Sequence, residues 1–86
     1  MEKLTAVAEA EGVLRELGFR QCRVRHHGAV ARVEVEADEI GRAAGAAREE
    51  IARRLRALGF TWVTLDLDGF RSGSMNEAPG GASAER

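Results

Sequence analysis

The pattern L-R-x-L-G-F occurs twice in this sequence, and it constrains the fold more strongly than any other feature. It reads LRELGF at residues 14–19 and LRALGF at residues 55–60, and alternating apolar residues follow each copy. Gly18 and Gly59 stand where helices commonly end in a left-handed residue, a conformation that glycine adopts without a Cβ clash. Each copy therefore predicts a helix that passes directly into a strand. The similarity covers only about eleven residues, which indicates a repeated local device rather than a duplicated domain.

Apolar residues at three- and four-residue steps predict the helix that precedes each glycine. The residues expected on the buried stripe of the first helix are Leu4, Val7, Ala8, Leu14 and Leu17. Those expected in the second helix, over residues 46–58, are Ala47, Ile51, Leu55 and Leu58. Phe19 and Phe60 should pack back over the last helical turns. Asp38 can cap a short helical turn through EIGRAAG, residues 39–45.

Period-two alternation predicts three strands, over residues 21–25, 31–36 and 62–68. The side chains expected to face the core are Cys22, Val24, Val33, Val35, Val63, Leu65 and Leu67. The order helix, strand, strand, helix, strand predicts an α+β two-layer sandwich, in which a three-stranded, mainly antiparallel sheet carries two helices on one face. If the first strand lies between the other two, the helical crossover joins parallel strands and can be right-handed.

The opposite face of the predicted sheet is charged and contains a tryptophan. Its residues are Arg23, Arg25, Arg32, Glu34, Glu36, Trp62, Thr64, Asp66 and Asp68. Cross-strand ion pairs would make this an ordinary solvated face, in which each exposed pair contributes about a few tenths of a kcal/mol or nothing. Alternatively, arginines at positions i and i+2, such as Arg23 and Arg25, project side by side and present a fork of donors that suits phosphate or carboxylate.

The two histidines of RVRHHG, residues 23–28, are expected with Gly28 in the hairpin between the first two strands. Adjacent strand residues point to opposite sides of a sheet, so His26 and His27 are poorly placed to chelate one metal. Hydrogen bonding to nearby backbone is the favoured role. We therefore predict no metal site and no cofactor, and we expect Cys22 to be a small core residue.

Length and charge limit the classes of protein that fit. With 86 residues the chain forms one domain at most, predicted over residues 1–75 and followed by a disordered tail at 76–86. A formal net charge of −1 argues against a nucleic-acid coat protein, which needs excess positive charge. The apolar runs are too short for a membrane span, and a single cysteine gives no internal disulfide, so a cytoplasmic protein is expected.

The loop after the third predicted strand carries a second anion signal. In DGFRSGSMNE, residues 68–77, Arg71 stands among glycines and the two serines Ser72 and Ser74. Backbone N–H groups and hydroxyls of such a loop could gather round an anion. Loops of this composition are common, and many bind nothing.

Two segments resemble the C-terminal region of the LarE family of ATP-dependent sacrificial sulfur transferases. They are LGFRQCRVRHHGAVARVEV at residues 17–35 and REEIARRLRALGFTWVTLDLDGFRSGSMNE at residues 48–77. Members carry a similar L-G-F-x-x-x-R-V-R-H-H-G segment, an A-R-I-E-V strand and a terminal G-Y-R-S-G-S-M-N-E, and the resemblance covers about residues 9–77. It implies a role in making the nickel-pincer nucleotide cofactor of lactate racemase. For this cofactor the family adenylates a pyridinium biscarboxylate mononucleotide and then donates a sulfur atom, in well-known members from one of the enzyme's own cysteines.

The chain departs from the family where the family's chemistry takes place. The ATP-binding S-G-G-x-D-S loop of the family's N-terminal half does not occur in this sequence, and nothing matches the sacrificial cysteine. Cys22 stands where the family usually has valine. The resemblance therefore implies a standalone C-terminal domain with no catalytic residue of its own. An excised fragment of a longer enzyme is the less favoured alternative, given the initiating Met1 and the additional tail.

Recognition of an anion is what the resemblance carries over to this chain. The residues that it implies for holding phosphate or carboxylate groups are Arg23, Arg25, Arg71, Ser72 and Ser74. Acidic family positions near the ligand or a metal correspond loosely to Glu11 or Glu34.

Two functions are predicted on this basis. In the first, the domain is a binding and assembly module that works with a separately encoded ATP-pyrophosphatase subunit on a nucleotide-like anion. In the second, it is a self-associating structural or regulatory protein whose arginines pair with Glu34, Asp66 and Asp68. A homo-oligomer is expected, with no nucleic acid and no membrane as a partner. The residues predicted for a subunit contact are Arg32, Glu34, Trp62 and Asp66.

Overall fold

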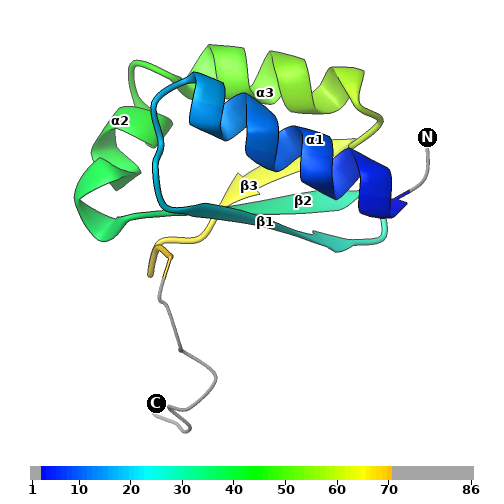
Figure 1. Ribbon diagram of the computed structural model, residues 1–86, viewed down its shortest axis with the longest axis horizontal. Coiled ribbons are helices and arrows are strands. Elements are labelled where there is room, and N and C mark those ends of the chain that lie inside the picture. The colour runs from blue at the N-terminus through cyan, green and yellow to red at the C-terminus, as the bar shows by residue number, and fades with distance from the viewer. Residues whose placement is uncertain (1–2, 71–86) are drawn as a thin grey trace, which may run out of the picture.

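The computed structural model describes residues 3–70 of the chain. Its elements are α1 (Lys3–Glu16), β1 (Cys22–His27), β2 (Val30–Val35), the 3-10 helix η1 (Ala37–Glu39), α2 (Ile40–Ala44), α3 (Arg48–Ala57) and β3 (Trp62–Leu65). The helices lie on one face of the sheet, so the predicted α+β two-layer fold is confirmed (Figure 1). None of the helices within residues 3–70 has both the length and the apolar character that a membrane crossing requires. The predicted tail lies outside the described residues.

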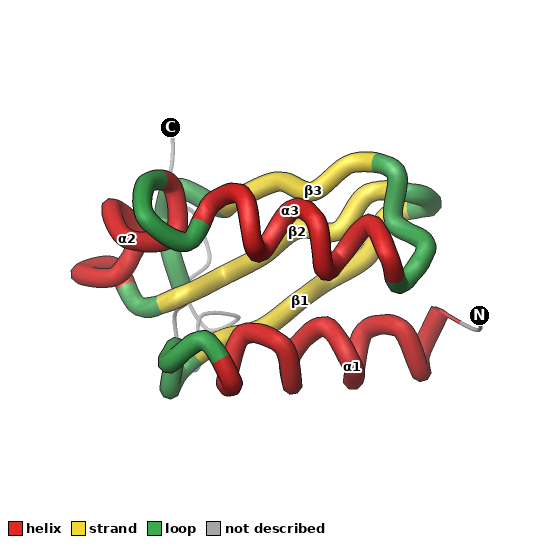
Figure 2. The backbone as a smooth tube through the Cα atoms, turned by 90° about the horizontal axis from the view of Figure 1, so that it is seen from above, coloured by secondary structure: helices red, strands yellow, loops and turns green. Residues whose placement is uncertain are grey.

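The sheet has the strand order β1-β2-β3, with β2 in the centre. β1 and β2 are antiparallel over six residue pairs, and β2 and β3 are parallel over four, so the sheet is mixed and mostly antiparallel. The expectation that the first strand lies in the centre is wrong. The helix α1 packs against β1, whereas α2 and α3 pack against β3. The connection through α2 and α3 therefore places β3 beside β2, on the side away from β1 (Figure 2).

The two L-R-x-L-G-F copies form the helix-to-strand joints that the sequence predicts. Gly18 and Gly59 have positive φ angles of 96° and 110°. In each joint the phenylalanine N–H donates to the carbonyl oxygen of the leucine five residues earlier, at 3.0 Å for Phe19 and 3.4 Å for Phe60. Both phenyl rings are buried, and each burial stabilises the fold by about 1.5–3 kcal/mol.

One apolar core fills the space between the helices and the sheet. Its members are Ala6, Ala10, Val13, Leu14, Phe19, Cys22, Val24, Ala31, Val33, Val35, Ala43, Ile51, Leu55 and Phe60. Three predicted core residues are wrong, because Leu4 and Leu67 are 73% and 80% exposed and Ala8 is also exposed. Ala6 and Ala10 of α1 face the core instead. Leu67 lies beyond the end of β3, where strand alternation no longer applies.

The third strand ends at Leu65, three residues earlier than predicted. A turn replaces it, because the Asp66 carboxylate accepts the N–H of Asp68 at 2.8 Å. Gly69 then has a φ angle of +81°, and a Cβ there would lie 2.8 Å from the carbonyl oxygen of Val35. This close approach requires glycine. It also lets Phe70 donate its N–H to Val35 at 2.6 Å, which holds the chain beside the end of β2.

Candidate anion-binding site

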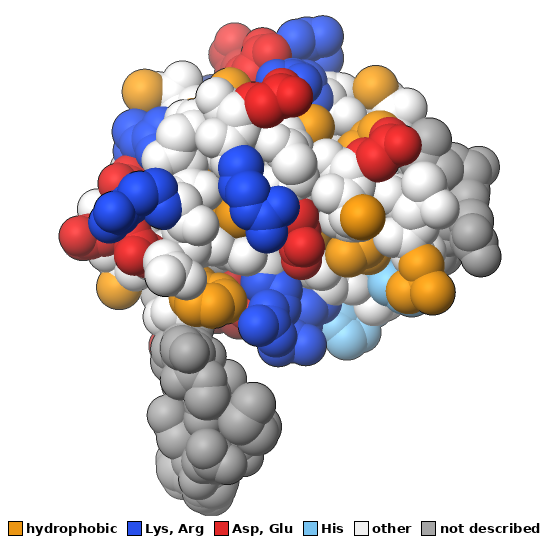
Figure 3. Space-filling view, viewed as in Figure 1, with side chains coloured by type: hydrophobic (Ala, Val, Ile, Leu, Met, Phe, Trp, Pro, Cys, Tyr) orange, Lys and Arg blue, Asp and Glu red, His pale blue; other side chains and the backbone are white. Residues whose placement is uncertain are grey.

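The face of the sheet that the helices leave open carries the predicted arginines. Arg23 and Arg25 come from β1, Arg32 comes from β2, and Asp66 follows β3. Figure 3 shows Lys and Arg side chains gathered along the lower edge of the molecule, next to histidine. Glu34, on β2, shares this face but is only 7% exposed. The alternation of the strands thus brings three cations and two carboxylates together.

Glu34 is the centre of a chain of ion pairs. Its Oε2 accepts hydrogen bonds from Arg25 Nε and from Arg32 Nη2, each at 3.1 Å. Arg32 Nε also lies 3.6 Å from Asp66 Oδ2, which is an ion-pair distance but too long for a hydrogen bond. The arginines are partly exposed, so each pair alone contributes at most about 1 kcal/mol. The buried carboxylate of Glu34, however, would be costly to leave without a cation.

Arg23 is the arginine that this chain of ion pairs leaves out. It is half-buried, and its Cζ lies 5.4 Å from the centroid of the Phe70 ring. Within residues 3–70 no carboxylate oxygen lies within ion-pair distance of its guanidinium. Its cross-strand neighbour Glu34 is already bonded to the other two arginines. Arg23 therefore keeps a positive charge that the described residues do not neutralise.

The structure brings only part of the predicted site into view. Arg23 and Arg25 lie on one face of β1, as predicted, whereas Arg71, Ser72 and Ser74 lie outside the described residues. Phe70 is the last described residue, and its ring lies under Arg23. The contact of Phe70 with Arg23 and the burial of Glu34 were both missed from the sequence. Phe70 stands beyond any strand pattern, and Glu34 sits at an alternating position that predicts exposure.

The histidines lie in the first strand and not in the turn that follows it. His26 and His27 belong to β1 rather than to the hairpin connection, which consists of Gly28 and Ala29. Both imidazoles are exposed, and adjacent strand positions direct them to opposite faces.

A group of carboxylates that was not predicted lies after β2. Ligand atoms of Glu36, Asp38 and Glu39 lie within 4.8 Å of one another. Arg42 already bonds Glu39 through its Nε, at 2.7 Å. The cluster is therefore partly neutralised by the protein itself.

Cys22 is a core residue, as predicted, and its surroundings keep it protonated. It is buried, and its thiol donates to the carbonyl oxygen of Glu11 at 3.9 Å. Burial raises the pKa of the Cys22 thiol, while Arg15 opposes the rise and Glu11 adds to it. A neutral thiol without solvent access is a poor nucleophile.

Glu11 and Glu34 were the two acidic candidates, and they lie in different places. Glu34 occupies the open face, whereas Glu11 belongs to α1 and accepts the N–H of Val24 at 3.0 Å through Oε2. Glu11 therefore binds one backbone N–H group on the outer edge of β1. It also lines an open groove between α1 and β1, where Arg23 and Arg25 form part of the wall.

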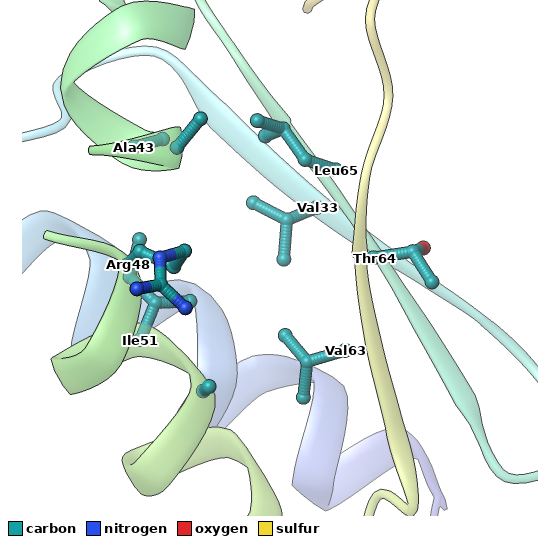
Figure 4. Close-up of a pocket in the computed structure, with 9 residues that line it drawn as sticks. Val33, Ala43, Arg48, Ile51, Val63, Thr64 and Leu65 are labelled. Carbon is teal, nitrogen blue, oxygen red and sulfur yellow. The ribbon is translucent and has the colours of Figure 1, made fainter.

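A separate apolar groove of about 200 Å³ lies between the helices and β3. Val33, Ile51, Val63 and Leu65 line it, with Arg48 at its rim (Figure 4). The side chains of Val63 and Leu65 point into the groove, and Thr64 points away from it. This groove is apolar and does not suit an anion.

Comparison with known proteins tests the resemblance. Over 76 residues, or 88% of its length, the chain is 45% identical to the pyridinium-3,5-bisthiocarboxylic acid mononucleotide synthase of Lactiplantibacillus plantarum, a LarE protein. The chain therefore contains a LarE-like domain. An uncharacterized protein of Synechocystis is 39% identical over 77 residues. No protein-family model matches the chain.

The LarE-like domain corresponds to a minor part of these relatives. The chain spans 27% of the length of the synthase and 29% of the length of the Synechocystis protein. The predicted resemblance to LarE is confirmed, and so is its partial extent.

Proposed function

We propose that this LarE-like domain binds the phosphate or carboxylate groups of a nucleotide-like anion at the β1 side of the open sheet face, as a binding module rather than an enzyme. The observation that carries the proposal is the environment of Arg23. Its guanidinium is half-buried against Phe70 and has no carboxylate partner within residues 3–70. A partly desolvated cation of this kind gains most from an anionic ligand.

The charge of the open face supports the same conclusion. Arg25 and Arg32 share Glu34, and Arg32 also lies near Asp66, so these ion pairs leave Arg23 without a carboxylate among the described residues. Arg25 uses Nε to bond Glu34, and a guanidinium has five N–H donors in all, so the donors of its Nη atoms remain for a ligand. The relative from L. plantarum is named for a mononucleotide, which carries a phosphate.

The proposal extends to the residues that follow Phe70. The N–H of Phe70 is bonded to Val35, so the chain leaves the described part of the structure beside Arg23. We assign Arg71, Ser72 and Ser74 as further ligands of the anion. Their hydroxyl and guanidinium groups have the donor chemistry that a phosphate accepts.

The proposal also includes a partner and a location. An ATP-using sulfur-transferase subunit would supply the chemistry that the domain itself lacks, in a pathway of nickel-pincer cofactor type, and its presence can be tested by co-purification. A cytoplasmic location suits the single reduced thiol of Cys22.

Titration of the isotope-labelled protein with nicotinate mononucleotide, AMP and inorganic phosphate tests the binding site. We expect saturable NMR shifts at residues 23–25 and at Phe70 with the nucleotides. Arg23→Ala and Arg25→Ala should each weaken binding about 10- to 150-fold, because a hydrogen bond to a charged group contributes about 1.5–3 kcal/mol.

Arg53→Ala is the matched control for these two variants. Arg53 lies on α3, is exposed and, within residues 3–70, pairs only with Glu50, so its loss should leave the affinity unchanged. Equal affinities for Arg23→Ala and the unmodified protein would contradict the proposal. The same would follow if all three ligands produced no shifts in a well-dispersed spectrum.

The second candidate function is self-association. The observation in its favour is that Arg25 and Arg32 are already paired within the chain, while Trp62 remains 62% exposed. Trp62 lies on β3, at the opposite edge of the sheet from Arg23 on β1.

A further inference from the structure

The two edge strands of the sheet, β1 and β3, differ in what their outward-facing backbone groups contact. At the β1 edge, Glu11 of α1 accepts the N–H of Val24, a group that would otherwise face outward. At the β3 edge, the N–H groups of Trp62 and Asp66 point inward, to the carbonyl oxygens of Ala29 and Val33 at 3.2 Å and 2.8 Å. Peptide groups alternate in direction along a strand, so those of Val63 and Leu65 point outward.

No element of the described chain covers this outward-facing edge, because β3 pairs with β2 alone. The strand sequence WVTL contains no lysine or proline, which are residues that commonly protect exposed edges. Its side chains also remain partly open to solvent. Val63 and Leu65 are only partly buried on the helix side, and Trp62 is 62% exposed on the other.

We propose that β3 pairs with β3 of a second copy of this chain, antiparallel and about a two-fold axis at Thr64. In this register Val63 lies opposite Leu65 of the second copy, and Leu65 lies opposite its Val63. The four outward-facing peptide groups then make four hydrogen bonds, two from each pair. The two three-stranded sheets become one sheet of six strands.

Complementary side chains favour a second copy as the occupant. On the helix side, Val63 of each copy meets Leu65 of the other, which removes both from water at the open apolar groove (Figure 4). On the open face, Trp62 comes opposite Asp66 of the second copy, and this pairs an indole N–H donor with a carboxylate acceptor. An antiparallel edge is also self-complementary, as a two-fold interface requires.

The size of this edge fixes the expected strength of association. A four-residue strand belongs to the class of small interfaces, below about 1,200 Å². The dimer should therefore depend on concentration rather than be permanent. This dimer does not involve the anion site, since Arg23 lies on β1, at the opposite edge of the sheet from β3.

Charged substitutions of Thr64, the residue at the proposed two-fold axis, test the proposal. Thr64 is exposed and would face Thr64 of the second copy, so Thr64→Lys and Thr64→Glu each place like charges directly opposite one another. In sedimentation equilibrium of the full chain, we expect each variant to dimerise severalfold more weakly than the unmodified protein. An equimolar mixture of the two variants should recover association, because Lys then faces Glu. His26→Lys, which adds the same charge to β1, should dimerise normally.

Two further measurements report directly on the environment of β3. With rising concentration, amide hydrogen exchange at Val63 and Leu65 should slow, and the fluorescence of the single tryptophan should shift to the blue. A protein that stays monomeric up to about millimolar concentration would overturn the proposal. So would a mixture of the folded Lys and Glu variants that associates no better than either variant alone, and so would a His26→Lys variant as weakened as Thr64→Lys.

Discussion

The two helix-to-strand joints have nearly the same sequence but different surroundings. Both end a helix at a glycine with positive φ, and both bury the next phenylalanine. At the first joint Arg42 stacks over the Phe19 ring, with 3.8 Å from Cζ to the centroid, and its Nη1 donates to the carbonyl oxygen of Leu17 at 2.9 Å. At the second joint no corresponding cation contacts Phe60 among the described residues.

This difference separates what a local pattern determines from what tertiary contacts add. The pattern sets the end of the helix and the burial of the phenylalanine in both places. Arg42 then ties α2 to the end of α1, across 25 residues of chain. The first joint leads into an edge strand that Glu11 contacts at Val24, and the second leads into an edge strand whose outer side no element of residues 3–70 pairs with. The same short sequence therefore begins two strands with different roles.

The largest expected effect comes from removing each phenyl ring. Phe19→Ala and Phe60→Ala should each lower the free energy of unfolding by about 3–5 kcal/mol, because both rings are buried. Phe19→Ala should cost about 1 kcal/mol more, since it also removes the cation–π contact with Arg42. Urea titration followed by circular dichroism measures both changes. Equal losses at the two joints would show that the Arg42 contact adds no stability.

A change at Arg42 itself should have a smaller effect that is confined to the first joint. Arg42→Met keeps much of the apolar stem but removes the hydrogen bonds to Leu17 and Glu39 and a cation–π contact, so we expect a loss of about 1.5–3 kcal/mol. Arg56→Met is the control at the second joint, because Arg56 is exposed there. It should change the stability by less than about 0.5 kcal/mol. Similar losses for the two variants would contradict the special role given to Arg42.

The smallest effect distinguishes Cys22 from its counterpart Val63, four residues after the glycine of the other joint. Burial raises the pKa of the native thiol, so above its ordinary pKa the unfolded chain releases a proton that the folded chain keeps. The contribution of Cys22 to stability should therefore fall as the pH rises from about 8 to 10. Cys22→Val should remove that part of the pH dependence in urea titrations. If the stability of Cys22→Val depended on pH in the same way as that of the unmodified protein, groups other than Cys22 would cause the dependence.

Most of the fold could be predicted from the sequence, because its signals are local. The L-R-x-L-G-F copies give both joints, and alternation gives all three strands with the correct inward residues on β1 and β2. The position of β2 in the centre could not be predicted, since it depends on which helix occupies the space above β1. The predicted burial of Leu4 and Leu67 was wrong, because a helical or strand pattern does not show where a helix or strand stops packing against the rest of the protein.

The candidate site was less predictable than the fold. Alternation correctly placed Arg23 and Arg25 on the open face, but the two residues look equivalent in sequence. Only the side-chain contacts show that Arg25 is paired with Glu34 while Arg23 lies over Phe70. Charge partners depend on side-chain reach across strands, and a one-dimensional pattern does not record it. The predicted roles of Arg71, Ser72 and Ser74 stay predictions.

The strand order has a consequence for how salt would affect the molecule. In a dimer paired through β3, the two β1 strands are separated by five strand spacings, about 24 Å, which is more than twice the Debye length at about 0.1 M salt. At low ionic strength, the positive charge of Arg23 in each copy would repel its counterpart across the paired edges. At physiological ionic strength this repulsion is largely screened. A cell's ordinary salt concentration would thus let one small sheet bind an anion at one margin and a second copy at the other, with little interference between them.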